Sequence, residues 1–338
     1  MAKGCTIFIA ADGKIKALLQ NEFPQASFLL LKGYHIQYSK QKKWLPLKML
    51  AQLPGIVSSI YREQQWLKTT VKIHDIDAVI ADNRFGLYHA TVPSVYLTHQ
   101  LIIKTGNSFS EKIVAKINYW FIQKYAECWV PDFEGNINIA GELSHPQFLP
   151  SNLQYIGCLS RFKKAVTTTK KYDLLVLLSG PEPQRTLFEE ILVMQLRQFS
   201  GTVLLVRGLP GDISAISAFN NGNIKFINHL GSAELNQAIA QSEIIICRSG
   251  YTTVMDLIKL QKKAVLVPTP GQTEQEYLAA HLLNQQFFYS VNQPDFNLQD
   301  ALKKAAVFEY RFAQFNMDQY QQVVNQFLKR LSNLVKMD

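Results

Sequence analysis

Short apolar runs alternate with amphipathic helical patterns twice along this chain, and that alternation limits the folds open to it. The strand-like runs of the first half are 6–10, 26–31, 78–81, 95–98 and 127–130, and those of the second half are 172–178, 202–206, 224–227, 244–247, 264–267 and 287–290. Short, β-branched runs separated by helices are typical of buried parallel strands. The sequence therefore predicts an α/β fold with two parallel sheets, each covered by helices.

A polar stretch with two Lys-Lys pairs and a run of threonines, residues 160–171, separates the two halves. We therefore expect two domains of ordinary size in the 338 residues. The predicted boundaries are 1–157 for the first domain, 158–171 for the linker, 172–312 for the second domain and 313–338 for a closing helix. Residues 46–68 are predicted to be largely helical, with an interruption near Pro54-Gly55.

Composition argues against a disordered chain, since 47% of the residues are hydrophobic and 18% are charged. No apolar run is long enough to span a bilayer and the N-terminus has no secretory signature, so a cytoplasmic protein is expected. The four cysteines form no C-x-x-C pair, which favours buried free thiols over zinc ligation or disulfides. The net charge of +9 attracts phosphates on nucleotides, nucleic acids or anionic membranes without choosing among them.

In open parallel sheets, ligands bind beyond the carboxyl ends of the strands, so the loops that follow the strands are the candidate sites. The loop 178–185 offers Gly180, which lets a backbone approach an anion closely, and the free N–H groups of a helix start. Arg185 can add a charge-assisted bond to a phosphate. The loop is equally compatible with a simple strand–turn–helix connection that carries a surface arginine.

The loop 247–256 joins a strand to a helix that starts within 251–253. Its backbone amides, together with the hydroxyls of Ser249, Thr252 and Thr253, suit a diphosphate. Asp256 lies about one helical turn further on, where a carboxylate can accept two hydrogen bonds from a ribose diol. The alternative is an ordinary N-cap followed by an exposed aspartate.

The loop 268–277 is rich in amides and carboxylates, among them Gln272, Gln275 and Glu276. Such groups recognise sugar hydroxyls through paired hydrogen bonds. The alternative is a capped helix start, because Thr273 and Glu276 fit a capping box. Three successive strand-to-helix junctions that face one cleft together suit a nucleotide diphosphate sugar.

The run CRSGYTTVMDLIKLQKKAVLVPTPGQTEQEY resembles the C-terminal signature of glycosyltransferase family 28. That signature consists of a strand, R-S-G, a helix with an acidic residue, a strand that ends in proline and a glutamine-rich helix start. The matching positions here are Arg248-Ser249-Gly250, Asp256, Pro268 and Gln275-Glu276. The resemblance extends over the second domain, and residues 95–100 with the following helix are more weakly similar to the family's N-terminal domain.

The resemblance implies a GT-B fold, in which two Rossmann-like domains face each other across a cleft, and a UDP-sugar donor with no metal or other cofactor. It implies that Asp256 binds the donor ribose and that the backbone of His229-Leu230 binds the uracil ring of the donor. It also implies that the last helix crosses back to the first domain. Glu276 stands where the family's peptidoglycan enzyme has a second glutamine, so the identity of the sugar stays open. The donor-binding candidates together are Ser179, Gly180, Arg185, His229, Leu230, Arg248, Ser249, Gly250, Tyr251, Thr252, Thr253, Asp256, Gln272, Gln275 and Glu276.

Family members usually begin with a strand and a glycine-rich loop that ends in histidine. Here residues 1–4 lead directly into what resembles the family's second strand, so the first β-α unit is expected to be absent. An inverting transfer needs a base to deprotonate the acceptor hydroxyl. His99, at the carboxyl end of the strand 94–98, is the candidate, and Asp82 is either an alternative base or its partner. Both residues are also compatible with structural roles in their loops.

The segment from Lys40 to Leu53 interleaves lysines with tryptophan and leucines. Such a segment can lie on an anionic membrane surface and present the cleft to a lipid-borne acceptor. A solvated lysine cluster followed by a core helix is the alternative. Nucleic-acid binding is not expected, because no recognised module is present.

The sequence thus predicts a bacterial cell-envelope glycosyltransferase that moves a sugar, in the first instance an N-acetylhexosamine, from UDP to an acceptor at the cytoplasmic membrane face. The acceptor is expected to be lipid-linked or a saccharide, and the protein is expected to be peripheral on the inner membrane. Two alternatives stay open. One is a nucleotide-sugar hydrolase that uses water as the acceptor, and the other is a non-catalytic nucleotide-sugar-binding protein.

Overall fold

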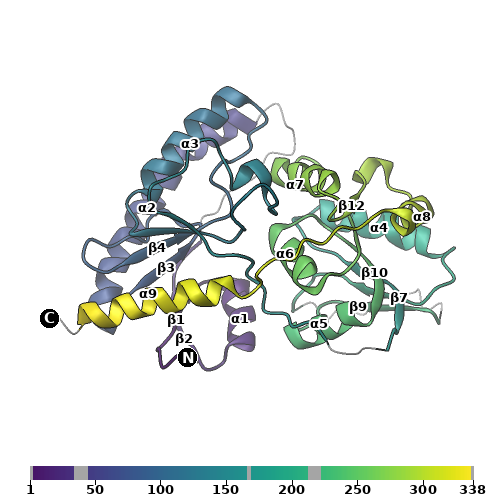
Figure 1. The fold of residues 1–338 in the computed structure, drawn as a ribbon, viewed down its shortest axis with the longest axis horizontal. Helices are drawn as coiled ribbons and strands as arrows, with labels where there is room; N and C mark the ends of the chain where they lie inside the picture. The colour runs from purple at the N-terminus through teal and green to yellow at the C-terminus, as the bar shows by residue number, and fades with distance from the viewer. Residues whose placement is uncertain (1–2, 34–44, 166–168, 212–221, 336–338) are drawn as a thin grey trace.

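Two parallel sheets lie side by side, each with helices against it, in the computed structural model of the protein (Figure 1). The structure describes residues 3–33, 45–165, 169–211 and 222–335, without the side chains of 14, 45–54, 108, 334 and 335. No helix in these ranges is both long enough and apolar enough to cross a membrane.

The N-terminal sheet has four parallel strands, and a separate parallel pair precedes it in the chain. The pair is β1 (Phe8–Ala11) and β2 (Ser27–Leu30), joined by α1 (Gly13–Glu22). The sheet runs in the order β3 (Val79–Asp82), β4 (Ser94–Leu97), β5 (Glu127–Val130) and β6 (Leu153–Tyr155). The connecting elements are α2 (Leu45–His74), α3 (Ser108–Ile122) and the 3-10 turn η2 (Gly141–Leu143).

The turn from β1 to α1 is Asp12-Gly13 and holds no histidine. Gly13 has a φ of 51°, in the left-handed region that favours glycine. The Asp12 carboxylate accepts a hydrogen bond from the Gly33 N–H at 3.0 Å, which ties the end of β1 to the chain after β2. The described chain thus opens on a β–α–β unit whose loop differs from the glycine-rich, histidine-ending loop of the family's pattern.

The predicted interruption near Pro54-Gly55 is wrong, because α2 runs unbroken from Leu45 to His74. A proline removes a single N–H donor from a helix, and the remaining backbone ladder of a long helix can absorb that loss. Further along α2, Leu67 is buried and Trp66 and Val71 pack against the N-terminal core. Tertiary packing therefore outweighs the local cost of the Pro-Gly pair.

The C-terminal sheet has six parallel strands in the order β12-β11-β10-β7-β8-β9. The strands are β7 (Tyr172–Leu177), β8 (Val203–Val206), β9 (Ile224–Ile227), β10 (Ser242–Cys247), β11 (Ala264–Leu266) and β12 (Tyr289–Ser290). The helices are α4 (Gln184–Leu196), α5 (Ser232–Ala240), α6 (Tyr251–Leu260), α7 (Thr273–Asn284) and α8 (Leu298–Val307), with a 3-10 turn η3 (Gln293–Asp295).

The central strands of this sheet are apolar at successive positions because helices cover both faces. In β10, Ile245 belongs to a core cluster that also contains Leu257 of α6 and Leu278 of α7. The next residue, Ile246, belongs to the opposite cluster, with Phe188 of α4. Because both faces of such a strand are buried, polar groups can gather only beyond its carboxyl end. The candidate loops follow the strands at that end.

The chain closes with α9 (Gln319–Val335), which lies against the N-terminal sheet (Figure 1). Its Phe327 is buried, and the ring centroids of Phe327 and Trp129 lie 5.4 Å apart at 81°. The Gln319 side-chain amide donates to the Tyr155 carbonyl at 3.0 Å. Residues 156–171 and the segment before α9 are therefore two separate covalent connections between the halves.

Candidate functional site

One buried guanidinium holds together the chain after β7, β10 and β11. Arg248 directly follows β10 and donates through Nη1 to the carbonyls of Val267 and Pro268 at 3.2 and 3.3 Å, and through Nη2 to that of Gln184 at 2.9 Å. The guanidinium lies 4.4 Å from the ring centroid of Phe188. Burial lowers the pKa of Arg248 to about 10. Because its donors point at protein carbonyls, the side chain forms the floor of the site.

The loops after β7 and β11 approach each other at Gly180. Gly180 has a φ of 100°, and a Cβ there would lie 3.5 Å from the Thr269 hydroxyl. That hydroxyl is buried and has no hydrogen-bond partner among the described residues. Ser179 beside it is exposed. A buried hydroxyl without a partner, next to a glycine, is a group that a bound oxyanion would satisfy.

The start of α6 offers the second part of an anion site. Gly250 is its N-cap, and a Cβ on Gly250 would meet nothing within 4 Å. The first turn carries the exposed Thr252 and the partly buried Thr253. Unpaired N–H groups at a helix start favour a negative charge. The structure therefore leaves open space where the sequence predicts the diphosphate.

Side chains predicted to face the sugar also fix the loop before α7. Ser249 is fully buried and donates to the Gln275 carbonyl at 2.8 Å. The Gln275 side-chain carbonyl accepts from the Thr269 N–H at 2.9 Å, which leaves its amide NH₂ as a donor. The Glu276 carboxylate accepts from the Gly271 N–H at 2.9 Å. The N-cap of α7 is Gln272, so the alternative capping box at Thr273 does not form.

His99 reaches from the N-terminal sheet to the C-terminal loops. Its Nε2 lies 2.8 Å from Oε1 of Glu274, and its ring stacks on Tyr251 with centroids 4.2 Å apart and planes at 6°. The Tyr251 hydroxyl donates to the carbonyl of Pro131 at 2.7 Å, back in the N-terminal domain. The candidate base from one domain thus meets the starts of α6 and α7 from the other.

Asp82 lies beside this contact. It ends β3 and pairs in register with Leu97 of β4, two residues before His99. Burial raises the pKa of Asp82, and the charge of His99 lowers it. The structure therefore brings both candidate catalytic residues into electrostatic reach of each other, at the carboxyl ends of adjacent strands.

Asp256 faces a pocket between the linker and α9. The Ser160 hydroxyl donates to Asp256 Oδ1, and burial raises the pKa of the carboxyl to about 6 despite that bond and the charges of Arg161 and Lys259. The pocket has a volume of about 350 Å³ and is lined by Leu159, Ser160, Arg161, Thr252, Asp256 and Tyr320. Thr252 and Asp256 share one side of α6, as residues four apart do.

Arg185 is buried and engaged within its own domain. Its guanidinium contacts Glu182 and Glu189 at 2.6 Å each, and Arg207 shares Glu189. The expected phosphate contact would require breaking these ion pairs, so Arg185 is not available to a donor phosphate while they persist. His229 is exposed after β9, and Leu230 packs against the core beneath the loops.

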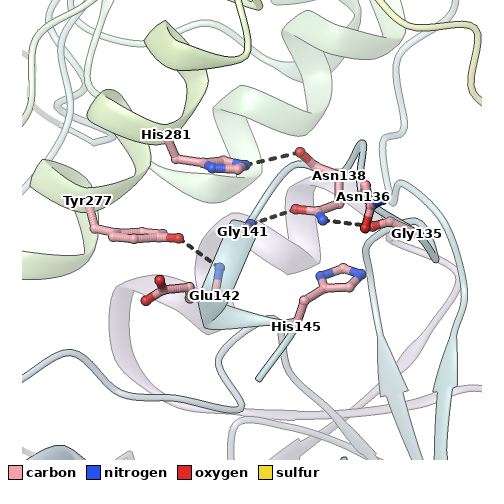
Figure 2. A pocket seen from close by; sticks show the side chains of 8 residues that line it. All are labelled: Gly135, Asn136, Asn138, Gly141, Glu142, His145, Tyr277 and His281. Carbon is pink, nitrogen blue, oxygen red and sulfur yellow. Dashed lines mark hydrogen bonds between the residues drawn. The ribbon is translucent and has the colours of Figure 1, made fainter. Parts of the chain in front are cut away.

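A second pocket lies at the seam between the two domains, and sequence reasoning missed it. We call it the seam pocket; it has a volume of about 440 Å³ and is lined by Gly135, Asn136, Asn138, Gly141, Glu142, His145, Tyr277 and His281. Figure 2 shows the rings of Tyr277 and His281, from α7, facing the loop after β5. The Tyr277 hydroxyl accepts from the Glu142 N–H at 2.7 Å, and His281 Nε2 lies 3.2 Å from the Asn138 carbonyl.

The sequence feature that could have indicated the seam pocket is Asp132, a polar residue just after a strand. Its fully buried carboxylate accepts from the backbone N–H groups of Phe133, Ile139 and Ala140 at 2.8 to 2.9 Å, and from the Ser144 hydroxyl at 2.6 Å.

Residues 34–44 and the side chains of 45–54 fall outside the described residues, so the membrane segment from Lys40 to Leu53 stays a prediction.

The model of the glycosyltransferase family 28 C-terminal domain matches residues 215–332, which confirms the resemblance. The UDP-N-acetylglucosamine–N-acetylmuramyl-(pentapeptide) pyrophosphoryl-undecaprenol N-acetylglucosamine transferase of Haemophilus ducreyi is 26% identical over 147 residues. These residues are 41% of this chain, and the match spans 40% of the length of that relative.

Solved structures resemble nearly the whole chain. The glycotransferase of kitacinnamycin has a TM-score of 0.60 at 14% identity, over 99% of this chain and 92% of that one. MurG of Acinetobacter baumannii has a TM-score of 0.52 at 15% identity, over 97% and 92%. These likenesses confirm the predicted two-domain GT-B fold.

Replacing Arg248 by lysine should destabilise the protein by about 2–3 kcal/mol, because an ammonium cannot bridge three carbonyls on two other loops as a planar guanidinium does. Chemical denaturation measures the loss. Arg311→Lys, an exposed arginine beside Glu309, is the matched control and should leave the unfolding midpoint unchanged. Equal midpoints for both variants would contradict the bracing role of Arg248.

Proposed function

We propose, from the glycosyltransferase family 28 C-terminal domain that residues 215–332 carry, that this protein transfers a sugar from a UDP-sugar to an acceptor. One observation carries the proposal. Arg248 braces the loops after β7, β10 and β11, and the loops after β10 and β11 contact His99 of the opposite domain through Tyr251 and Glu274. A donor held by those loops would place its reacting carbon at the seam, next to a candidate base.

The donor lies across three groups of the C-terminal domain in this proposal. Its diphosphate meets the start of α6 and the Thr269 hydroxyl beside Gly180, which lacks a protein partner among the described residues. Its ribose diol meets Asp256, and its sugar meets Gln275 and Glu276. The sugar we expect is an N-acetylhexosamine, the class that the Haemophilus relative transfers.

His99 is the base in the proposed reaction. The acceptor hydroxyl gives its proton to the imidazole, the acceptor oxygen forms a bond to the anomeric carbon, and the bond from that carbon to the diphosphate breaks. UDP leaves with the electron pair. Nε2 is held by Glu274 at 2.8 Å, so Nδ1 is the nitrogen that takes the proton, and the carboxylate stabilises the imidazolium that forms. Asp82 adds negative charge nearby.

An exposed apolar face on α3 supports an acceptor carried by a membrane. Its large side chains recur on one side of the helix and are 73%, 46%, 49% and 57% exposed at Phe109, Ile113, Ile117 and Trp120. Phe148, 74% exposed, belongs to a loop that is tied to α3, because its carbonyl accepts from the Tyr119 hydroxyl.

Cations frame this α3 face. Lys112 and Lys116 are exposed on the same helix, and Lys124 Nζ lies 3.9 Å from the ring centroid of Trp120. Apolar side chains ringed by lysines fit an anionic bilayer surface. We therefore propose that α3 docks on the cytoplasmic face of the inner membrane and presents the seam to a lipid-linked or saccharide acceptor.

Asp256→Asn should weaken binding of UDP-N-acetylglucosamine about tenfold or more near pH 7.5, because an amide replaces a carboxylate that accepts two hydroxyl hydrogen bonds. Calorimetric titration measures the affinity, and assay of the same mixture for free UDP measures turnover. Undiminished binding by the variant would remove the ribose assignment. Release of free sugar with no acceptor would favour a hydrolase, and binding without any turnover a binding protein.

The affinity of the wild-type protein should fall about tenfold from near pH 7.5 to near pH 5, since Asp256, with a pKa of about 6, is ionised at the higher pH and protonated at the lower. The raised pKa gives this sign: the ribose-binding form is lost as the pH falls through about 6. Asp256→Asn should show no such dependence. A UDP-sugar has no phosphate that titrates in this window, so an equal fall in both proteins would point to another group.

Replacing Ile117 and Trp120 together by serine should weaken binding to vesicles that contain phosphatidylglycerol by about tenfold or more, because two large side chains no longer enter the bilayer interface. Vesicle co-sedimentation measures the binding. Val307→Ser removes an even more exposed aliphatic side chain from the C-terminal domain and is the control. Unchanged sedimentation of the double variant would contradict docking through α3.

A further inference from the structure

The seam pocket is built from a rigid loop. Asp132 fixes the backbone at Phe133, Ile139 and Ala140, and Asn138 bridges the Gly135 carbonyl and the Gly141 N–H at 2.9 and 2.7 Å. These bonds are buried or partly buried. The loop is thereby set in one shape before any ligand arrives, which lowers the entropy cost of binding.

Two parallel rings of α7 form the opposite wall. The planes of Tyr277 and His281 lie at 6°, with centroids 6.0 Å apart. Gly141, with a φ of 55°, lets these rings lie against the loop, since a Cβ there would overlap the Tyr277 hydroxyl and come within 2.8 Å of His281 Nδ1. The pocket therefore exists only while the two domains are together.

The lining chemistry indicates the class of ligand. Amides, a carboxylate and aromatic rings surround the space, from Asn136, Asn138, Glu142, Tyr277 and His281. Lysine and arginine are absent from the described lining, which disfavours a phosphate. The polar groups disfavour a purely apolar ligand, because they would lose water without replacement. Amide and carboxylate groups beside flat rings suit the hydroxyls and the C–H faces of a sugar.

The position of the pocket relates it to the proposed reaction. Glu274, which contacts His99, starts the same helix on which Tyr277 and His281 lie one and two turns later. Lys104 links the two places: its carbonyl accepts from the Thr273 hydroxyl at 2.7 Å, and its Nζ lies 2.8 Å from Glu142. A ligand in the seam pocket is therefore near the base and outside the donor loops.

We propose that the seam pocket binds a neutral saccharide unit, and that this unit belongs to the acceptor. The second part rests on the proposed function. Because the walls come from both domains, saccharide binding favours the arrangement in which His99 meets the C-terminal loops. The volume of about 440 Å³ lies within the range of small-ligand pockets.

Saturation-transfer NMR on the full chain tests this with the methyl β-glycosides of N-acetylglucosamine, glucose and galactose and with N,N′-diacetylchitobiose, each with and without UDP. We expect at least one of these sugars to bind. Asn136→Ala, which truncates an exposed lining side chain, should weaken its affinity about tenfold. Ile137→Ala is the matched control. The Ile137 side chain is exposed on the same loop, next to Asn136 in the chain, but does not line the pocket. Gly141→Ala, whose Cβ would overlap the Tyr277 hydroxyl and push the two rings away from the loop, should also abolish binding.

The outcomes separate this inference from the proposed function. Saccharide binding that depends on Asn136 in a protein that does not bind UDP would support the pocket and refute the donor site. UDP binding without binding of any of these sugars would overturn the pocket and leave the donor site standing. Equal binding by the wild type and both loop variants, Asn136→Ala and Ile137→Ala, would place the saccharide elsewhere and also overturn the inference.

Discussion

The guanidinium of Arg248 is the constraint on which the rest of the site depends. Parallel strands end at one edge of a sheet, but nothing in the sheet itself fixes the loops beyond that edge. Arg248 does so by donating to carbonyls at the ends of two other loops. Its burial disfavours the charged form and lowers its pKa to about 10, so three carbonyl dipoles and the Phe188 ring must offset that cost.

The loops that Arg248 braces contact the other domain, which carries the candidate base. His99, Pro131 and Glu142 of the N-terminal half contact Glu274, Tyr251 and Tyr277 of the C-terminal half. The candidate base, the donor loops and the seam pocket therefore share one interface. Two chain connections, through residues 156–171 and through the segment before α9, allow that interface to form without joining the sheets. A ligand that binds to either domain at this interface therefore lies next to the same contacts between the domains.

Local sequence patterns predicted the strands and the loops that follow them. Apolar runs found the strands, and the rule that ligands bind after parallel strands found His99, Asp82 and the loop around Arg248. It could not find the partners, because His99 and Glu274 lie 175 residues apart and only the fold brings them together. For the same reason Arg185 looked available in the sequence, whereas in the structure Glu182 and Glu189 engage it. The break expected in α2 failed because packing outweighed local propensity.

The role of His99 tests the account most directly. The measurement is UDP release from UDP-N-acetylglucosamine by the full chain with a lipid extract of bacterial envelopes as acceptor source, for the wild type and for His99→Gln. We expect release by the wild type, a loss of about a hundredfold or more in the variant, and calorimetric donor affinity within about twofold of the wild type. Equal rates in the two proteins, or no release by the wild type, would contradict this expectation.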